Sequence, residues 1–202
     1  MPLVNLYPSN TIGSPSGDDW VIIGGFSTIH ESLADDGGTG TGAECTTADA
    51  YIEVELDNLD SAGLNIATIT SIQATMEANI DERSQTSLLR CDYRDSSGNV
   101  INSYTDNLGI ATTGTNTEYT WTARTTSNGS DAWIDSDIDG MRLRILLRTD
   151  SSVGNTEVFH LYLTVTYTEI PPQSTYTSDD QVTLSGGTLE FKNGMTIIGS
   201  KN

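Results

Sequence analysis

The chain has 202 residues with 28 acidic and 9 basic side chains, which gives a formal net charge of −19. Nucleic acids and anionic membranes attract clusters of Lys and Arg, so this charge excludes both as partners. Hydrophobic residues make up 36% of the chain and aromatic residues 7%, more than a disordered acidic chain carries. We therefore expect a folded, acidic protein.

Alternation of apolar and polar residues predicts a series of half-buried β-strands. Weaker signals at 3–7, 20–23 and 29–33 are followed by clear ones at 50–56, 72–80, 89–94, 100–104, 118–124, 141–148 and 157–168. The turn at 95–98 joins two of these strands into a hairpin. Between the strands, one helical turn is predicted over 131–139, because Ile134 and Ile138 share a face. Many strands without a long helix predict an all-β fold, an antiparallel β-sandwich with jelly-roll-like connections.

The domain boundary is predicted at Ile170, because two prolines follow it and end the last long strand. We expect a jelly-roll domain over 1–170, a linker over 171–180 and a C-terminal β-hairpin appendage over 181–202. An isolated hairpin is marginally stable in water, so this one should dock on a partner surface or mediate oligomerisation. Its interface candidates are Val182, Leu184, Leu189 and Phe191.

Catalytic chemistry has little support in the sequence. The two histidines, His30 and His160, lie near no nucleophile turn, and His160 is expected on the outer, solvated or interface-forming face of its strand. Glu53 and Glu55 are expected to point to solvent, which leaves a hydrolase with paired carboxylates as the third-ranked hypothesis. We therefore expect that the protein is not an enzyme and that it has neither catalytic residues nor a cofactor.

The cysteines and the N-terminus indicate whether a disulfide and a secretory signal are expected. Cys91 occupies an apolar strand position and is expected to be a small buried hydrophobe, although a single bridge to Cys45 stays open. Met1 is followed by neither a basic segment nor an apolar run, so no secretory signal is expected.

Two features suggest a ligand. The run Asp135, Asp137 and Asp139 followed by Gly140 matches the opening of a calcium-binding loop, but Leu146 stands where the loop needs its glutamate. An exposed acidic turn is therefore favoured over calcium, and no metal is assigned. Trp133, beside Asp131 and Asp135, is expected to be exposed and is the candidate carbohydrate-binding residue, whereas Trp121 should point into the core.

The basic residues are unevenly distributed. All nine lie at Arg83 or later, and the first 82 residues carry only acidic charges. The strand Arg142 to Arg148 is consequently the one place where an acidic partner is expected to dock.

Four segments taken together carry a resemblance to a known family. They are Leu6-Tyr7-Pro8-Ser9 before the Trp20 strand, Tyr51-Ile52-Glu53-Val54, Tyr119-Thr120-Trp121-Thr122, and Met141-Arg142-Leu143-Arg144-Ile145 after a short helical turn. In their order and spacing, which span about Leu3 to Thr168, the chain resembles jelly-roll virion proteins of tailed bacteriophages, found as capsid decoration and head-fibre proteins.

The resemblance implies a non-enzymatic structural protein on the exterior of a phage virion, made in the host bacterial cytoplasm. Its implied partners are the major capsid protein or other virion proteins, and the implied state is a homo-oligomer, with a trimer favoured. The alternative function is a carbohydrate-binding module of a tail fibre or receptor-binding protein.

Overall fold

The computed structural model describes residues 1–13, 20–35, 40–47, 49–80, 86–103, 108–111, 116–127, 129–148 and 156–171. All of these except Pro171 belong to one compact unit, Met1–Ile170. The predicted linker, apart from Pro171, and the predicted C-terminal hairpin lie outside the described residues. So do the four interface candidates, Val182, Leu184, Leu189 and Phe191.

Short strands dominate the secondary structure. The elements are β1 (Leu3–Leu6), β2 (Pro8–Gly13), β3 (Trp20–Ile23), α1 (Ile29–Ala34), β4 (Gly42–Cys45), β5 (Tyr51–Leu56), η1 (Leu59–Ala62), β6 (Ile66–Ile80), β7 (Thr86–Arg94), β8 (Val100–Ser103), β9 (Leu108–Ala111), β10 (Thr117–Thr120), α2 (Asp135–Ile138), β11 (Arg142–Arg148) and β12 (Thr156–Glu169).

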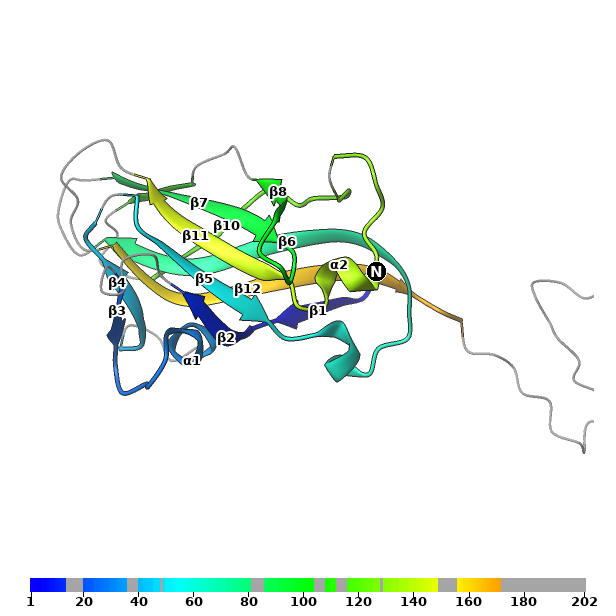
Figure 1. The fold of residues 1–202 in the computed structure, drawn as a ribbon, viewed down its shortest axis with the longest axis horizontal. Coiled ribbons are helices and arrows are strands. Elements are labelled where there is room, and N and C mark those ends of the chain that lie inside the picture. The colour runs from blue at the N-terminus through cyan, green and yellow to red at the C-terminus, as the bar shows by residue number, and fades with distance from the viewer. Residues whose placement is uncertain are drawn as a thin grey trace, which may run out of the picture. The chain divides into compact units, whose positions relative to one another are not determined.

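Two sheets pack face to face and form the predicted antiparallel β-sandwich (Figure 1). Sheet A has the order β10-β6-β12-β4-β3, with β1 also paired to β12, and sheet B has the order β2-β5-β11-β7-β8, with β9 paired to β7. The chain passes repeatedly from one sheet to the other, for example from β1 to β2, from β4 to β5 and from β5 to β6. This jelly-roll-like connectivity confirms the predicted fold class.

The core lies between the inner faces of the two sheets. Because side chains alternate across a strand, every second residue of β5 and β11 points inward, as their sequences predict. The buried set on these two strands is Ile52, Val54, Leu56, Leu143, Ile145 and Leu147. Trp121 is also buried, which confirms its predicted inward orientation. The residues between these positions form the outer face of sheet B, which is the face turned away from sheet A.

The weak strand predicted over 29–33 is wrong, because the segment forms the helix α1. A capping box begins the helix: the Glu31 amide donates to the Thr28 hydroxyl, and the Glu31 carboxylate accepts from the Thr28 amide at 3.1 Å. These reciprocal bonds satisfy amides that would otherwise lack partners at a helix start. The Thr-x-x-Glu spacing was therefore a stronger local signal than the short apolar run.

His160 was expected on the outer face of its strand, solvated or at an interface, but its side chain is buried, with 7% exposed. The register of β12 against β6 shifts between Val158 and His160, so a β-bulge interrupts the alternation. After the bulge, the His160 ring stacks on Tyr7 with 5.6 Å between ring centroids, and Tyr162 packs against it at 5.1 Å. Gly42 of β4 faces the bulge with φ of +147°, where a Cβ atom would collide with the Val158 carbonyl. This close approach explains the glycine.

Both cysteines are buried and neither forms a disulfide, so the bridge that the sequence left open is not formed. Burial raises the pKa of the Cys91 thiol well above its usual range, and the Asp92 charge adds to this rise. Cys91 thus occupies the small buried hydrophobic position that its strand predicts. Among the described residues, no helix is both long and apolar enough to cross a membrane.

One buried hydrogen bond ties the two sheets together, and it yields a prediction. The Ala74 amide of β6 donates to the Tyr93 hydroxyl of β7 at 3.0 Å. Tyr93→Phe removes the acceptor and leaves a buried amide unsatisfied, so the free energy of unfolding measured in urea should fall by about 1–3 kcal/mol. In the control Tyr162→Phe, the lost hydroxyl is a donor on a solvent-accessible face. That change should stay within about 0.5 kcal/mol, and equal losses in both variants would contradict the prediction.

Candidate functional site

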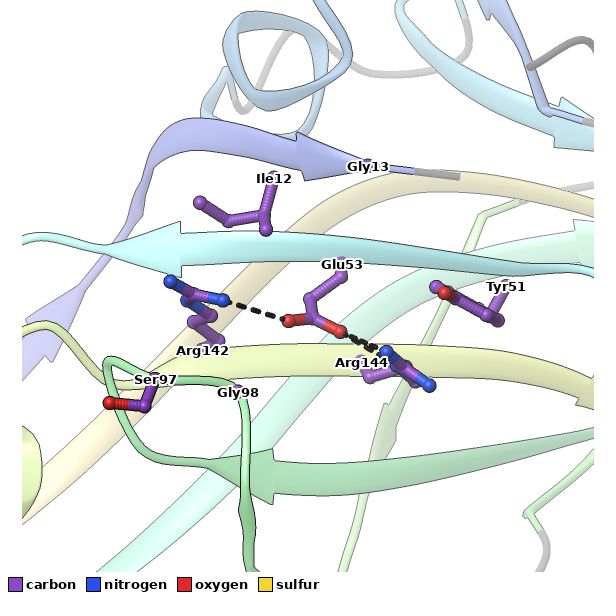
Figure 2. A pocket seen from close by; sticks show the side chains of 8 residues that line it. All are labelled: Ile12, Gly13, Tyr51, Glu53, Ser97, Gly98, Arg142 and Arg144. Carbon is purple, nitrogen blue, oxygen red and sulfur yellow. Dashed lines mark hydrogen bonds and ion pairs between the residues drawn. The ribbon is translucent and has the colours of Figure 1, made fainter. Parts of the chain in front are cut away.

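A polar hollow of about 310 Å³ opens on the outer face of sheet B (Figure 2). Its volume lies at the lower end of the range of roughly 300–1,000 Å³ that is typical of ligand sites. Strands β2, β5 and β11 and the turn between β7 and β8 supply the lining. The lining residues are Ile12, Gly13, Tyr51, Glu53, Ser97, Gly98, Arg142 and Arg144.

Strand register places opposite charges side by side beneath the hollow. Arg144 of β11 lies between Glu53 of β5 and Asp92 of β7, and each is its direct cross-strand partner. The next row of the same face places Arg142 between Glu55 and Arg94. Directly opposed side chains come within about 4.5–5.5 Å at Cβ, so the three strands gather these charged side chains into one cluster on the outer face.

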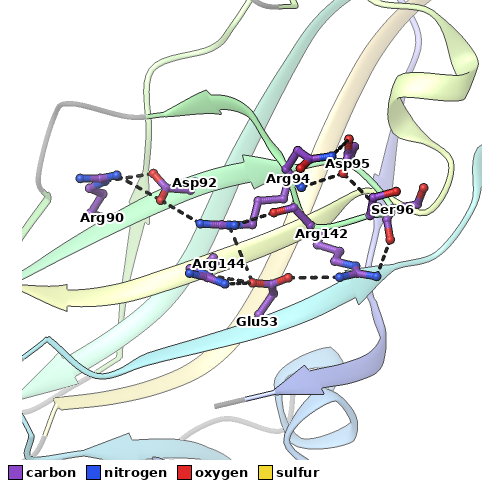
Figure 3. A network of polar contacts seen from close by, with 11 residues as sticks. Glu53, Arg90, Asp92, Arg94, Asp95, Ser96, Arg142 and Arg144 are labelled. Carbon is purple, nitrogen blue, oxygen red and sulfur yellow. Dashed lines mark hydrogen bonds and ion pairs between the residues drawn. The ribbon is translucent and has the colours of Figure 1, made fainter. Parts of the chain in front are cut away.

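Glu53 is the centre of the resulting network (Figure 3). One carboxylate oxygen, Oε2, lies 2.7 Å from Arg144 Nε, 2.6 Å from Arg144 Nη2 and 3.8 Å from Arg94 Nε. The other, Oε1, lies 3.5 Å from Arg142 Nη1. Glu53 was expected to point to solvent. It does lie on the outer face, but it is only 3% exposed because the three arginines cover it.

Asp92 forms a second, adjoining ion pair. Arg90 donates to both of its carboxylate oxygens, at 3.0 and 3.1 Å, and Arg94 Nη2 approaches it at 4.0 Å. Such two-pronged contacts fix a guanidinium more firmly than a single bond does. Arg94, which contacts both Glu53 and Asp92, therefore joins the two clusters into one network.

An aromatic ring supports one arginine of the hollow. The guanidinium carbon of Arg144 lies 3.7 Å from the centroid of the Tyr51 ring. This distance is well within the range of about 6 Å for a cation–π interaction. Tyr51 and Glu53 together hold the Arg144 guanidinium at the wall of the hollow.

The turn between β7 and β8 forms the rim. Arg142 Nη2 donates to the Ser96 carbonyl, and Arg94 Nη1 donates to the Gly98 carbonyl at 2.6 Å. Gly98 has φ of +86°, a conformation that favours glycine. The arginines beneath the hollow thus also position its rim.

Asp95 organises this turn and gives a prediction on pH. Hydrogen bonds from the Asn99 side chain and backbone, followed by those from Ser97 and Gly98, lower the pKa of the Asp95 carboxyl below its ordinary value. A carboxyl with a lowered folded-state pKa stabilises the fold above its unfolded pKa of about 3.9 and loses this contribution as the pH falls through the folded value.

We therefore expect the amide resonances of Ser97 and Asn99 to shift together in an NMR titration, with a midpoint below about pH 3.9. In Asp95→Asn the same resonances should not titrate there. A midpoint at or above the ordinary value for aspartate would contradict the assignment.

Trp133 does not have the expected exposure. It is only 2% exposed, its Nε1 donates to the Arg124 carbonyl at 3.0 Å, and its ring meets Tyr93 edge-on at 6.5 Å. The prediction of an exposed, sugar-stacking Trp133 is therefore wrong, although its neighbours Asp131 and Asp135 are exposed. A large apolar ring is more stable buried in the core than exposed on a polar turn, provided that its N–H finds a hydrogen-bond acceptor in the core.

The aspartates that match the opening of a calcium-binding loop do not converge. Asp137 Oδ2 accepts from the Ile134 amide at 3.2 Å at the start of α2, and Asp139 Oδ1 accepts from the Leu59 amide at 3.0 Å. Asp135 is exposed. Within the described ranges, no group of three or more His, Cys, Asp or Glu side chains could hold a metal ion. Asp137 and Asp139 thus have structural roles, at the start of α2 and in a bond to Leu59.

The hollow was not predicted as a site, although the sequence contained a signal for it. Arg142 to Arg148 was expected to be the place where an acidic partner docks, and Arg142 and Arg144 do line the hollow. Glu53 was expected only to point to solvent, and Tyr51 was given no role in a site. Pairing of β5 with β11 brings the four together, across about 90 residues of sequence.

Comparison with known proteins gives no family. No family model matches the sequence, and no curated protein matches it. The phage virion resemblance therefore gains no support from a sequence family.

Solved structures with a similar fold are mainly carbohydrate-binding modules, and the three named below are remote in sequence. The C-terminal CBM6 of LamC, a marine laminarinase from Zobellia galactanivorans, is 9% identical with a TM-score of 0.41, over 82% of this chain and 99% of that chain. CBM35 from Paenibacillus barcinonensis is 17% identical with a TM-score of 0.43, over 83% and 100%. TmCBM27, a mannan-recognising module, is 9% identical with a TM-score of 0.42, over 82% and 99%. Likeness at this level is confined to fold class.

Proposed function

We propose that this chain is a non-catalytic β-sandwich module that binds carbohydrate in the hollow on the outer face of sheet B. The observation that carries the proposal is the lining of the hollow, where two guanidinium groups, a carboxylate, a tyrosine and a polar turn converge. Sugar hydroxyls both donate and accept hydrogen bonds, so they suit a lining that offers donors and acceptors together. A small concave site with a few convergent polar groups is the general form of a ligand site.

The same lining supports binding over hydrolysis. Glycoside hydrolysis uses two carboxyl groups that flank the scissile bond. Of the eight residues that line the hollow, only Glu53 is an acid, and Arg142 and Arg144 both engage it. Glu53 is therefore better suited to positioning the arginines than to acting as a proton donor or nucleophile.

A glycan array with two matched variants tests the proposal. Wild-type protein should bind at least one glycan, and Tyr51→Ala should weaken that binding about tenfold, a loss of about 1.4 kcal/mol, because Arg144 loses its support. The control is Tyr162→Ala, which removes a tyrosine from the outer face of sheet A and leaves the hollow intact. It should bind as the wild type does.

Two outcomes would overturn the proposal. Binding that is lost in Tyr162→Ala and kept in Tyr51→Ala would place the site on sheet A, beside the ring stack of Tyr7 and His160. Failure of folded wild-type protein to bind any glycan would remove the function itself. Circular dichroism of each variant checks that the β-sandwich is intact.

The virion role remains a separate prediction that rests on the resemblance. It comprises a decoration or head-fibre protein on a phage exterior, partners among the capsid proteins, and a trimer. Mass spectrometry of purified particles would test its location. A glycan-binding module on a tail fibre or receptor-binding protein would combine both predictions.

A further inference from the structure

We propose that the hollow on sheet B binds a saccharide that bears a carboxylate, such as a uronic acid, and that Arg144 and Arg142 are the residues that recognise this group. The inference rests on the proposed function and specifies the class of sugar.

Local charge is the first argument. The whole chain carries a net charge of −19, yet two arginines and one glutamate line the hollow, which gives 2 − 1 = +1. Glu55, the next acid on this face of β5, lies outside the lining and accepts from Asn10 at 3.4 Å. The rest of the acidic surface repels anions, but at physiological salt this repulsion is screened beyond about 8 Å. A small anion that reaches the hollow therefore meets a locally positive site.

Unused hydrogen-bond donors are the second argument. A guanidinium has five N–H groups, and an arginine whose partners use only some of them can bind a further acceptor. The contacts of Arg144 with described residues use Nε and Nη2, both on one oxygen of Glu53, which leaves Nη1. Arg142 donates from Nη1 to Glu53 at 3.5 Å and from Nη2 to the Ser96 carbonyl, so each of these two nitrogens keeps one further N–H, while its Nε is buried. Glu53 alone therefore does not satisfy the two arginines.

Preorganisation is the third argument. Arg142 and Arg144 are two residues apart on β11, so they project from the same face, and Glu53 lies between them (Figure 2). Their side chains are 21% and 23% exposed, so they remain accessible while the network and the Tyr51 ring fix them. A carboxylate matches the planar fork of a guanidinium, and such charge-assisted bonds are about twice as strong as those from a neutral hydroxyl.

The test compares an acidic sugar with its own neutral ester. Isothermal titration calorimetry is run on the full chain with a short galacturonate oligomer, its methyl ester and a galactose oligomer. The galacturonate should bind at least about tenfold more tightly than the ester, because esterification removes the negative charge and turns one carboxylate oxygen into a weakly accepting, methylated ester oxygen. A short oligomer keeps the ligand away from the acidic surface around the site.

Variants assign the effect to the arginines. Arg144→Gln and Arg142→Gln should each weaken galacturonate binding about tenfold, while Arg144→Lys, which keeps the charge but not the fork, should fall between. Arg90→Gln is the matched control, because Arg90 lies on the same sheet face and pairs with Asp92 but does not line the hollow. It should stay within about twofold, a difference well below 1 kcal/mol. Two glutamine variants are used so that misfolding of one leaves the other as the test.

Each failure has its own signature. If galacturonate and its methyl ester bind equally tightly, the carboxylate assignment is overturned and the proposed function stays in place. Dextran sulfate, a sugar polymer whose anionic groups are sulfates, is a further probe. If it binds as tightly as galacturonate does, the carboxylate assignment is likewise overturned. Absence of binding to every sugar would overturn both the carboxylate assignment and the proposed function. Binding of poly-glutamate in that case would indicate an acidic protein partner.

Discussion

Trp133→Ala should lower the free energy of unfolding by about 3–5 kcal/mol, the usual range for removing a buried tryptophan. The indole connects the two halves of the sandwich: it meets Tyr93 of sheet B, and its N–H donates to the Arg124 carbonyl, which also accepts from Ile72 of sheet A. Small domains have a total stability of roughly 5–15 kcal/mol, so the loss is a large part of it. Urea unfolding followed by fluorescence or circular dichroism measures the change.

The adjacent residue is the control. Ile134 is 57% exposed, so Ile134→Ala should change the free energy of unfolding by no more than about 0.5 kcal/mol. Similar small losses in both variants would show that Trp133 is exposed in solution. The result also bears on glycan binding, since a binding defect in Trp133→Ala would then be explained by unfolding rather than by a lost stacking contact.

Glu53→Gln should have the second largest effect: the free energy of unfolding should fall by about 2–4 kcal/mol. Breaking a buried ion pair by neutralising one partner costs about 3–5 kcal/mol, and partial exposure of the arginines reduces this figure. The neutral amide has nearly the same shape, so the loss reports charge rather than packing. Arg94, Arg142 and Arg144 lose their shared counter-ion and face one another across β7 and β11.

Glu55→Gln is the matched control, because Glu55 lies on the same face of the same strand, two residues further along. Its carboxylate accepts from the exposed Asn10 side chain, and the Ser9 hydroxyl donates to its backbone carbonyl, so the change should stay within about 0.5 kcal/mol. Equal stability of Glu53→Gln and the wild type in urea would mean that the network contributes only to ligand recognition. High salt should narrow the difference between the two variants, because it screens the exposed part of the repulsion.

Most of the sandwich could be predicted from periodicity. The predicted strands around Tyr51–Leu56, Ile66–Ile80, Arg142–Arg148 and Thr156–Glu169 are confirmed, and so is the hairpin of β7 and β8. Strands β2, β4 and β9 were not predicted, because Pro, Ser, Asn and Gly weaken the β signal in short segments. Their pairing with longer strands compensates for low intrinsic preference.

The candidate site could be predicted only in part. The basic strand was identified as a docking place, but the partners of Arg142 and Arg144 depend on which strand lies beside β11. Trp133 was placed on the surface because its sequence neighbours are polar. Its actual environment comes from Tyr93 and Arg124, which are distant or on another element.

By itself, the sequence determined the all-β class, the inward and outward faces of the main strands, the burial of Cys91 and Trp121, and the acidic character of the protein. The acidic character follows from composition, and a period of two residues is enough to fix the strand faces, because it depends only on each strand's own geometry. Tertiary structure alone decided that Glu53 is buried among arginines, that His160 lies in a ring stack, and that Trp133 closes the core. Alternation tells which face a side chain occupies, whereas its partners are set by strand order and register between segments far apart in the chain.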